Sequence, residues 1–112
     1  MKIINFPRQL RELTSVGPAM LRDFEMLNVK SVEQLACEEP NEMYERLGRI
    51  TGKLQDPCVL DVFTAAVAQA RDPELPPAQR QWWYWSRERK RGAAASAQHR
   101  SQYSRRRPSA TR

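Results

Sequence analysis

Apolar side chains recur every three or four residues along most of this chain, the spacing that places them on one face of an α-helix. Between residues 18 and 27 the apolar stripe consists of Leu21, Phe24 and Leu27. No stretch of useful length alternates apolar and polar residues as a half-buried strand does. The pattern therefore predicts an all-α protein.

Prolines, glycines and capping residues divide this pattern into a compact bundle of five to six short helices. Ser31 and Gln34 have capping-box spacing, Gly52 follows an apolar stripe, and Asp56-Pro57 pairs an N-cap carboxylate with proline at the first helical position. Asn28 can end the second helix because asparagine tolerates the left-handed conformation. The expected helices cover residues 7–14, 18–27, 31–38, 40–52, 57–71 and 78–91, with 57–71 as the buried central helix.

The turn between the first two expected helices is the strongest candidate site. Its residues are Ser15, Val16, Gly17, Pro18 and Ala19. The first amides of a helix lack intrahelical partners and carry the positive end of the helix dipole, so such a turn can seat a phosphate. Arg22, one helical turn further on, and Arg11 from the preceding helix could add charge. The alternative is a purely structural connection in which Val16 fills the core.

The net charge of +6 is unevenly distributed. Residues 1–86 carry ten basic and twelve acidic groups, whereas residues 87–112 carry nine basic groups and one acidic group. Residues 1–86 are therefore mildly acidic, with a net charge of −2, and the basicity of the whole chain is no argument that the domain binds DNA.

Residues 92–112 lack apolar periodicity and predict a disordered Arg-rich tail. Basic residues at the end of the last helix and in the tail could contact DNA or RNA phosphates without sequence preference. The same charges could instead only keep the domain soluble. The candidate contacts are Arg89, Lys90, Arg91, Arg105, Arg106 and Arg107.

The aromatic run Trp82-Trp83-Tyr84-Trp85 can either cover the core or stack on nucleic-acid bases. Four consecutive aromatic side chains cannot all face inward from one helix, so we expect at least two of them to pack in the core. Base stacking by the others is the alternative.

Enzymatic chemistry finds little support in this sequence. The only histidine, His99, falls in the expected tail, so a histidine-assisted nucleophile is not available on the domain. Cys37 and Cys58 form no metal-binding spacing, and we expect both to be buried free thiols. Cys58 could be reactive because of its place at a helix N-terminus. We expect a non-enzymatic protein with no metal and no cofactor.

Three segments together resemble a known family. Residues 13–35 resemble a helix-hairpin-helix motif, and the continuation through Tyr44-Glu45-Arg46-Leu47, Gln55–Phe63 and Trp82–Trp85 looks like the bacterial pathogenicity locus, or mitomycin-resistance-like, proteins. The resemblance covers about residues 8–90. It implies an all-helical domain with a DNA-related role, in DNA repair or mobile DNA. The helix-hairpin-helix motif implies sequence-independent contact with phosphates, but its usual first glycine is Ser15 here.

These observations make non-specific DNA binding through the hairpin the leading hypothesis. A protein-interaction module with an exposed apolar or aromatic surface is the alternative. No run of residues is apolar and long enough for a membrane span or a signal peptide, so a cytoplasmic location is expected. The sequence does not predict an oligomeric state, and it leaves open whether residues 48–56 form a second hairpin.

Overall fold

The computed structural model describes the backbone of residues 8–103 and the side chains of residues 8–92. This part of the chain contains five α-helices, two short 3-10 helices and no strand, which confirms the all-α prediction. The elements are η1 (Leu10–Glu12), α1 (Pro18–Met26), α2 (Val32–Ala36), α3 (Pro40–Thr51), α4 (Pro57–Arg71), η2 (Pro77–Arg80) and α5 (Trp82–Tyr103). None of the helices described combines the length and apolarity needed to cross a bilayer.

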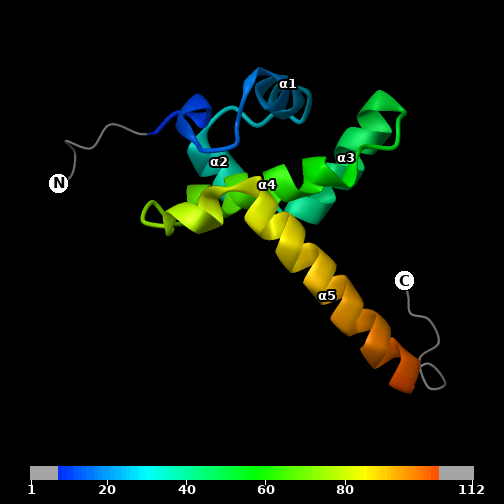
Figure 1. The fold of residues 1–112 in the computed structure, drawn as a ribbon. Helices are drawn as coiled ribbons and strands as arrows, with labels where there is room; N and C mark the ends of the chain where they lie inside the picture. The colour runs from blue at the N-terminus through cyan, green and yellow to red at the C-terminus, as the bar shows by residue number, and fades with distance from the viewer. Residues whose placement is uncertain (1–7, 104–112) are drawn as a thin grey trace.

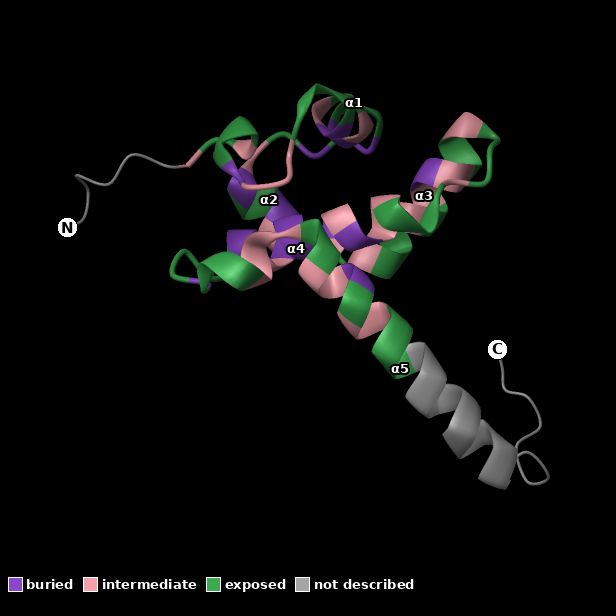
Figure 2. Ribbon diagram, viewed as in Figure 1, coloured by how far each residue is buried: buried purple, intermediate pink, exposed green. Residues whose placement is uncertain are grey.

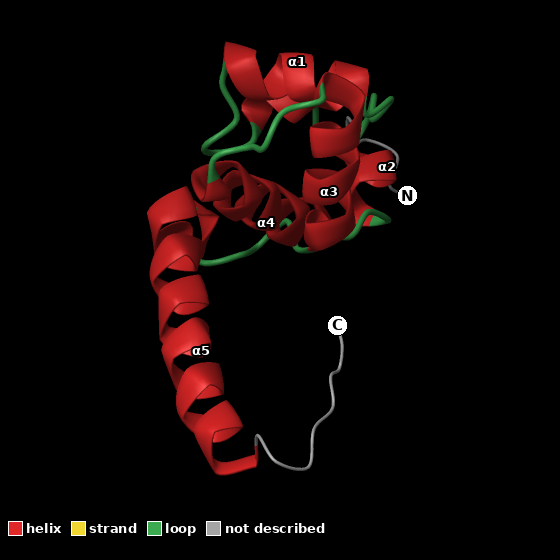
Figure 3. Ribbon diagram, turned by 90° about the vertical axis from the view of Figure 1, so that its right-hand side faces the viewer, coloured by secondary structure: helices red, strands yellow, loops and turns green. Residues whose placement is uncertain are grey.

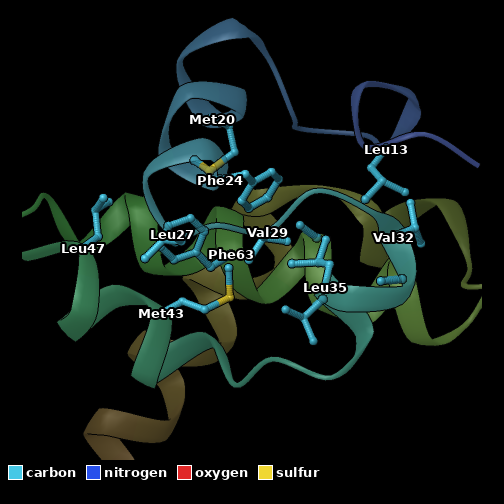
Figure 4. Packing of buried hydrophobic residues seen from close by; sticks show 13 residues of the cluster. Leu13, Met20, Phe24, Leu27, Val29, Val32, Leu35, Met43, Leu47 and Phe63 are labelled. Atoms are coloured by element: carbon cyan, nitrogen blue, oxygen red, sulfur yellow. The ribbon is translucent and has the colours of Figure 1, made fainter. Parts of the chain in front are cut away.

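Helix α4 is the centre of the molecule, as its sequence predicts (Figures 1 and 3). It packs against α2, α3 and α5, and α1 lies across the same core. The Phe24 ring from α1 stacks against the Phe63 ring from α4, with 6.0 Å between the ring centres. Figure 4 shows these two rings among the buried side chains of α1, α2 and α3. The apolar stripes seen in the sequence therefore meet in one shared core.

The helix boundaries follow the capping residues closely. The Ser31 hydroxyl accepts a hydrogen bond from the Gln34 amide, and the Asp56 carboxylate accepts one from the Cys58 amide. That bond lowers the pKa of Asp56, because it stabilises the ionised carboxylate. Gly52 ends α3 with φ = 69°, and Asn28 follows α1 with φ = 62°. The cap at Asp56 and the helix ends at Gly52 and Asn28 are confirmed. The capping box is confirmed in part, because the Gln34 side chain accepts from the Lys30 amide and not from that of Ser31.

The prediction of a first helix over residues 7–14 is wrong. Its described part is a single 3-10 turn, Leu10–Glu12, followed by an extended residue at Leu13. Only three residues lie between the extended Gln9 and the extended Leu13, which is less than one 3.6-residue turn of an α-helix. The turn at residues 15–19 therefore joins a 3-10 turn to a helix.

The prediction that the last helix starts near Ala78 and ends near Arg91 is also wrong. Residues 77–80 form η2, and α5 starts at Trp82 and continues to Tyr103, so the expected domain boundary after residue 91 falls within this helix. Alanine, glutamine and arginine, which dominate this stretch, favour the helix even without an apolar face to bury. Helix α5 points away from the core (Figure 1), and the rest of the expected disordered tail, residues 104–112, lies outside the described residues.

Candidate nucleic-acid interface

The turn between η1 and α1 has a left-handed residue where the helix-hairpin-helix motif usually has its first glycine. Ser15 has φ = 74°, and Gly17 has an ordinary extended backbone with φ = −108°. A positive φ costs an L-residue about 1–2 kcal/mol, a cost that glycine avoids. Serine at this position therefore keeps the backbone path that a glycine would give, at some cost in stability.

Hydrogen bonds from distant parts of the chain hold Ser15 in this conformation. Its Oγ donates to the Arg80 carbonyl at 3.3 Å and accepts from the Trp82 amide at 3.1 Å. The hydroxyl thus satisfies the first amide of α5, and both of its hydrogen-bonding directions are used inside the protein. The serine side chain supports the turn and is not free to bind a phosphate.

Gln69, on the central helix α4, fixes the residue before the turn. Its side-chain amide accepts a hydrogen bond from the Thr14 amide at 2.9 Å and donates one to the Thr14 carbonyl at 2.8 Å. Gln69 is only 4% exposed, so these bonds form away from water and are costly to break. The turn is therefore anchored to the core on one side and to α5 on the other.

The outer side of the turn presents free backbone donors. Within the described residues, the amides of Gly17, Ala19 and Met20 have no hydrogen-bond acceptor, and the first bond of α1 runs from Leu21 to Gly17. Gly17, Pro18 and Ala19 are exposed, and Val16 lies half-buried against the core. The turn therefore has features of a structural connection and of a binding site, because Val16 contributes to packing and the neighbouring residues Gly17, Pro18 and Ala19 are exposed.

Cations from η1, α1 and the loop after α1 lie around the face of α1 that continues from the turn. Pro18, Leu21, Arg22 and Glu25 share this face by helical spacing. Two adjoining hollows of about 610 and 370 Å³ lie along it and share Leu10, Leu21 and Lys30. Arg11 lines the larger hollow and Arg22 the smaller one, whereas the turn residues themselves line neither.

The groove formed by these hollows is locally positive in a domain that is close to neutral. The basic residues lining it are Arg8, Arg11, Arg22 and Lys30, against Glu25 and Glu33. Among the described residues, Arg11, Arg22 and Lys30 have no salt bridge, so their charge is available to a ligand. Burial raises the pKa of the neighbouring Asp23, and the Arg22 charge only partly opposes this effect.

Several other arginines of the domain donate hydrogen bonds to backbone carbonyls. Arg8 donates to the carbonyls of Gln69 and Ala70, and Arg71 donates to those of Ala36 and Glu38. Arg8 is therefore a capping residue of α4. Because these arginines already have partners, fewer cations are available to a ligand than the number of basic residues suggests.

Two of the residues expected to contact phosphate from the tail have partners on the protein. Arg89 forms a two-pronged salt bridge with Asp61 of α4, at 2.8 and 2.9 Å. Arg91 pairs with Glu88 at 2.8 Å. The Arg89 guanidinium compensates a carboxylate that is only 1% exposed, and its contact with phosphate stays a prediction. Lys90 is exposed, and Arg105, Arg106 and Arg107 lie outside the described residues.

The aromatic run does not enter the core, contrary to the expectation that at least two of its members would. Trp82 and Trp83 are 37% and 41% exposed, and Tyr84 and Trp85 are half-buried at the surface. The Trp85 indole donates to the Gln79 carbonyl, and the Arg87 guanidinium lies 4.8 Å from the centre of the Trp83 ring. The smaller side chains of α4 and α1–α3 already fill the core, so α5 contributes Ser86 to the buried set instead.

Both cysteines are exposed, so the expectation of buried thiols is wrong. Cys58 lies in the first turn of α4 beside Asp56. The hydrogen bond to the Asp56 carboxylate, together with the negative charges of Asp56 and Asp61, raises the pKa of the Cys58 thiol. The thiol therefore stays protonated at neutral pH, and this removes the main argument for a reactive cysteine.

Of the residues at the candidate site, Arg11 and Arg22 were predicted from the sequence, whereas Lys30 and Gln69 were not. Lys30 lies in a turn with no motif of its own and reaches the groove only through the path of the chain after α1. Gln69 lies 55 residues from its partner Thr14. In the sequence, Gln69 is only one of several polar residues in the mostly apolar helix 57–71, so its role could not be predicted.

Comparison with known proteins identifies the family. Residues 4–91 match the family model described as pathogenicity locus. The mitomycin resistance protein McrB of Streptomyces lavendulae is 40% identical over 82 residues, which cover 73% of this chain and 74% of that protein. No solved structure matches the chain. The extent of both sequence matches shows that this chain belongs to the pathogenicity locus family.

Proposed function

We propose that the protein binds the backbone of DNA without sequence preference, through the turn at residues 15–19 and the basic groove beside it. The observation that carries this proposal is the left-handed Ser15, with its hydroxyl bonded internally. The amides of Gly17, Ala19 and Met20 at the positive end of α1 have no acceptor among the described residues, and Gly17 and Ala19 are exposed. A phosphate oxygen is the ligand that such a set of donors fits best.

The groove supports the same proposal with charge. Arg11, Arg22 and Lys30 surround an apolar floor on the face of α1 that begins at the turn. Backbone contacts of this kind position a protein on DNA but carry no base information. The expected binding is therefore weak in sequence preference and strongly dependent on salt.

Substitutions on a labelled mixed-sequence duplex test the proposal through fluorescence anisotropy of the full-length chain. A Cβ at Gly17 would meet no atom within 4 Å, so Gly17→Val is expected to keep the fold and to hinder only an approaching phosphate. We expect at least about fivefold weaker binding, the loss of roughly one hydrogen bond to a charged group. The double substitution Arg11→Ala with Arg22→Ala is expected to reduce the salt slope by about 1–2.

Lys53→Ala is the matched control, because it removes an exposed cation at the turn between α3 and α4. It should change the affinity less than either of the other variants. If Gly17→Val is folded by circular dichroism and binds the duplex as tightly as the unsubstituted chain, the turn does not contact the DNA backbone.

A protein-interaction module is the second candidate, and one surface favours it. Leu54, between α3 and α4, is 96% exposed, and Ile50 at the end of α3 is half exposed. Gln55 donates to the Thr51 hydroxyl and accepts from the Tyr44 hydroxyl, and both bonds stiffen the loop that presents Leu54. An exposed apolar pair on a braced loop suits a protein partner. This candidate becomes the better one if the Gly17→Val test fails.

A further inference from the structure

The first turn of α5 lies directly beside the turn proposed to bind phosphate. The Ser15 hydroxyl accepts the Trp82 amide at 3.1 Å, so the start of α5 and the left-handed residue of the turn are held together. Trp82 and Trp83 are the two large aromatic side chains most exposed in the described structure. A nucleic-acid strand bound at the turn would therefore pass next to these rings.

The exposed side of α5 combines an aromatic ring with cations. Trp83, Arg87 and Lys90 share one face of the helix by their spacing of four and three residues. The Arg87 guanidinium lies 4.8 Å from the centre of the Trp83 ring and 6.0 Å from that of Tyr84. In the described part of the chain, neither Arg87 nor Lys90 has a salt bridge, so both charges are open to a ligand.

An adjoining side of the same helix is bound to the protein. Ser86 is buried, and Arg89 is held by Asp61 of α4. This contact orients α5, so that the face with Trp83, Arg87 and Lys90 points outward. Figure 2 shows exposed and half-buried residues alternating along this part of α5. The aromatic and basic face is thus fixed in place by the contacts on the buried side.

We propose that Trp83, together with Trp82 and the adjacent cations Arg87 and Lys90, stacks on an unpaired base of the bound strand. Surfaces that bind single-stranded nucleic acid combine stacking rings with cations for the backbone, and these rings accept any base. The preferred ligand is therefore duplex DNA with a single-stranded end or an unpaired stretch, in which bases are free to stack. This inference rests on the proposed function, because the adjacent turn supplies the phosphate contact.

Tryptophan fluorescence gives a direct test, since all three tryptophans of the chain lie within residues 82–85. Three DNA probes are titrated into the full-length protein: a blunt duplex, the same duplex with a short single-stranded overhang, and that overhang built from abasic nucleotides. We expect the overhang to quench the emission and to bind about fivefold to a hundredfold more tightly than the blunt duplex. The abasic overhang should lose both effects while keeping its phosphates.

Trp83→Ala should abolish the preference for the overhang and leave the affinity for the blunt duplex within about twofold, since stacking and phosphate contacts contribute separately. The ring lies outside the core, so the variant should fold, and Trp83→Phe should retain part of the preference. Equal binding of all three probes, without quenching, would overturn the stacking inference and leave the aromatic surface to a protein partner. Failure of every probe to bind would overturn the proposed function as well.

Discussion

Ser15 affects the stability of the turn in two opposite ways. Its backbone has φ = 74°, a conformation that is unfavourable for a residue with a Cβ, whereas its hydroxyl makes two hydrogen bonds that a glycine could not make. The same side chain orders the turn and supplies the acceptor for the first amide of α5. The departure from the usual glycine is therefore compensated by a contact specific to this fold.

A pair of substitutions separates the two roles. Ser15→Ala loses the hydroxyl contacts and keeps the unfavourable φ, so it should lower the free energy of unfolding by about 1–2 kcal/mol. Ser15→Gly loses the same contacts but relieves the backbone, and we expect it to be about 0.5–1 kcal/mol more stable than Ser15→Ala. Urea denaturation of both variants measures the difference. An alanine variant as stable as the unsubstituted chain would show that the hydroxyl contacts contribute nothing.

At the scale of elements, the position of α5 depends on one ion pair. Asp61 is buried in α4, and both of its carboxylate oxygens accept hydrogen bonds from Arg89. The hydrogen bond to Asp61 is the main reason that the pKa of Arg89 is raised above its ordinary value. Arg89 therefore keeps its positive charge, and the ion pair helps to fix the angle at which α5 leaves the core.

Removal of the arginine should be costly because it leaves Asp61 without a counter-charge. We expect Arg89→Leu to lower the free energy of unfolding by about 2–3 kcal/mol, near the lower end for buried pairs because part of the Arg89 side chain contacts water. Lys90→Leu, at the exposed neighbouring position, is the matched control and should change stability by less than about 0.5 kcal/mol. Urea denaturation compares the two. Similar stability of both variants would mean that Asp61 finds another partner or takes up a proton at little cost.

Helices bounded by proline, glycine or capping residues could be predicted from the sequence, whereas contacts between distant residues could not. Asp56-Pro57 and Gly52 are local signals, and α3 and α4 have the predicted limits. The end of α5 was missed because the absence of an apolar stripe says nothing about helix propensity. In the candidate site, the turn and two of its cations could be found, whereas the Gln69 and Asp61 contacts join residues 55 and 28 positions apart.

At the scale of the whole molecule, function depends on which charges remain available. Backbone carbonyls and carboxylates engage several arginines of the domain, and the free cations that remain lie mainly along the α1 groove and the outer face of α5. The start of α5 lies beside the turn, because the Trp82 amide is bonded to Ser15, and the groove lies along α1, the helix that follows the turn. A nearly neutral domain can therefore present a local surface suited to a nucleic-acid strand.

The amide NMR spectrum of the full-length protein, titrated with a short DNA duplex, tests phosphate binding at the turn residue by residue. We expect the largest chemical-shift changes on Gly17, Ala19 and Met20, with smaller changes at Arg11, Arg22 and Lys30, and we expect added salt to reverse them. Changes confined to the last residues of the chain, with none at residues 15–22, would contradict the claim that the turn binds the DNA backbone.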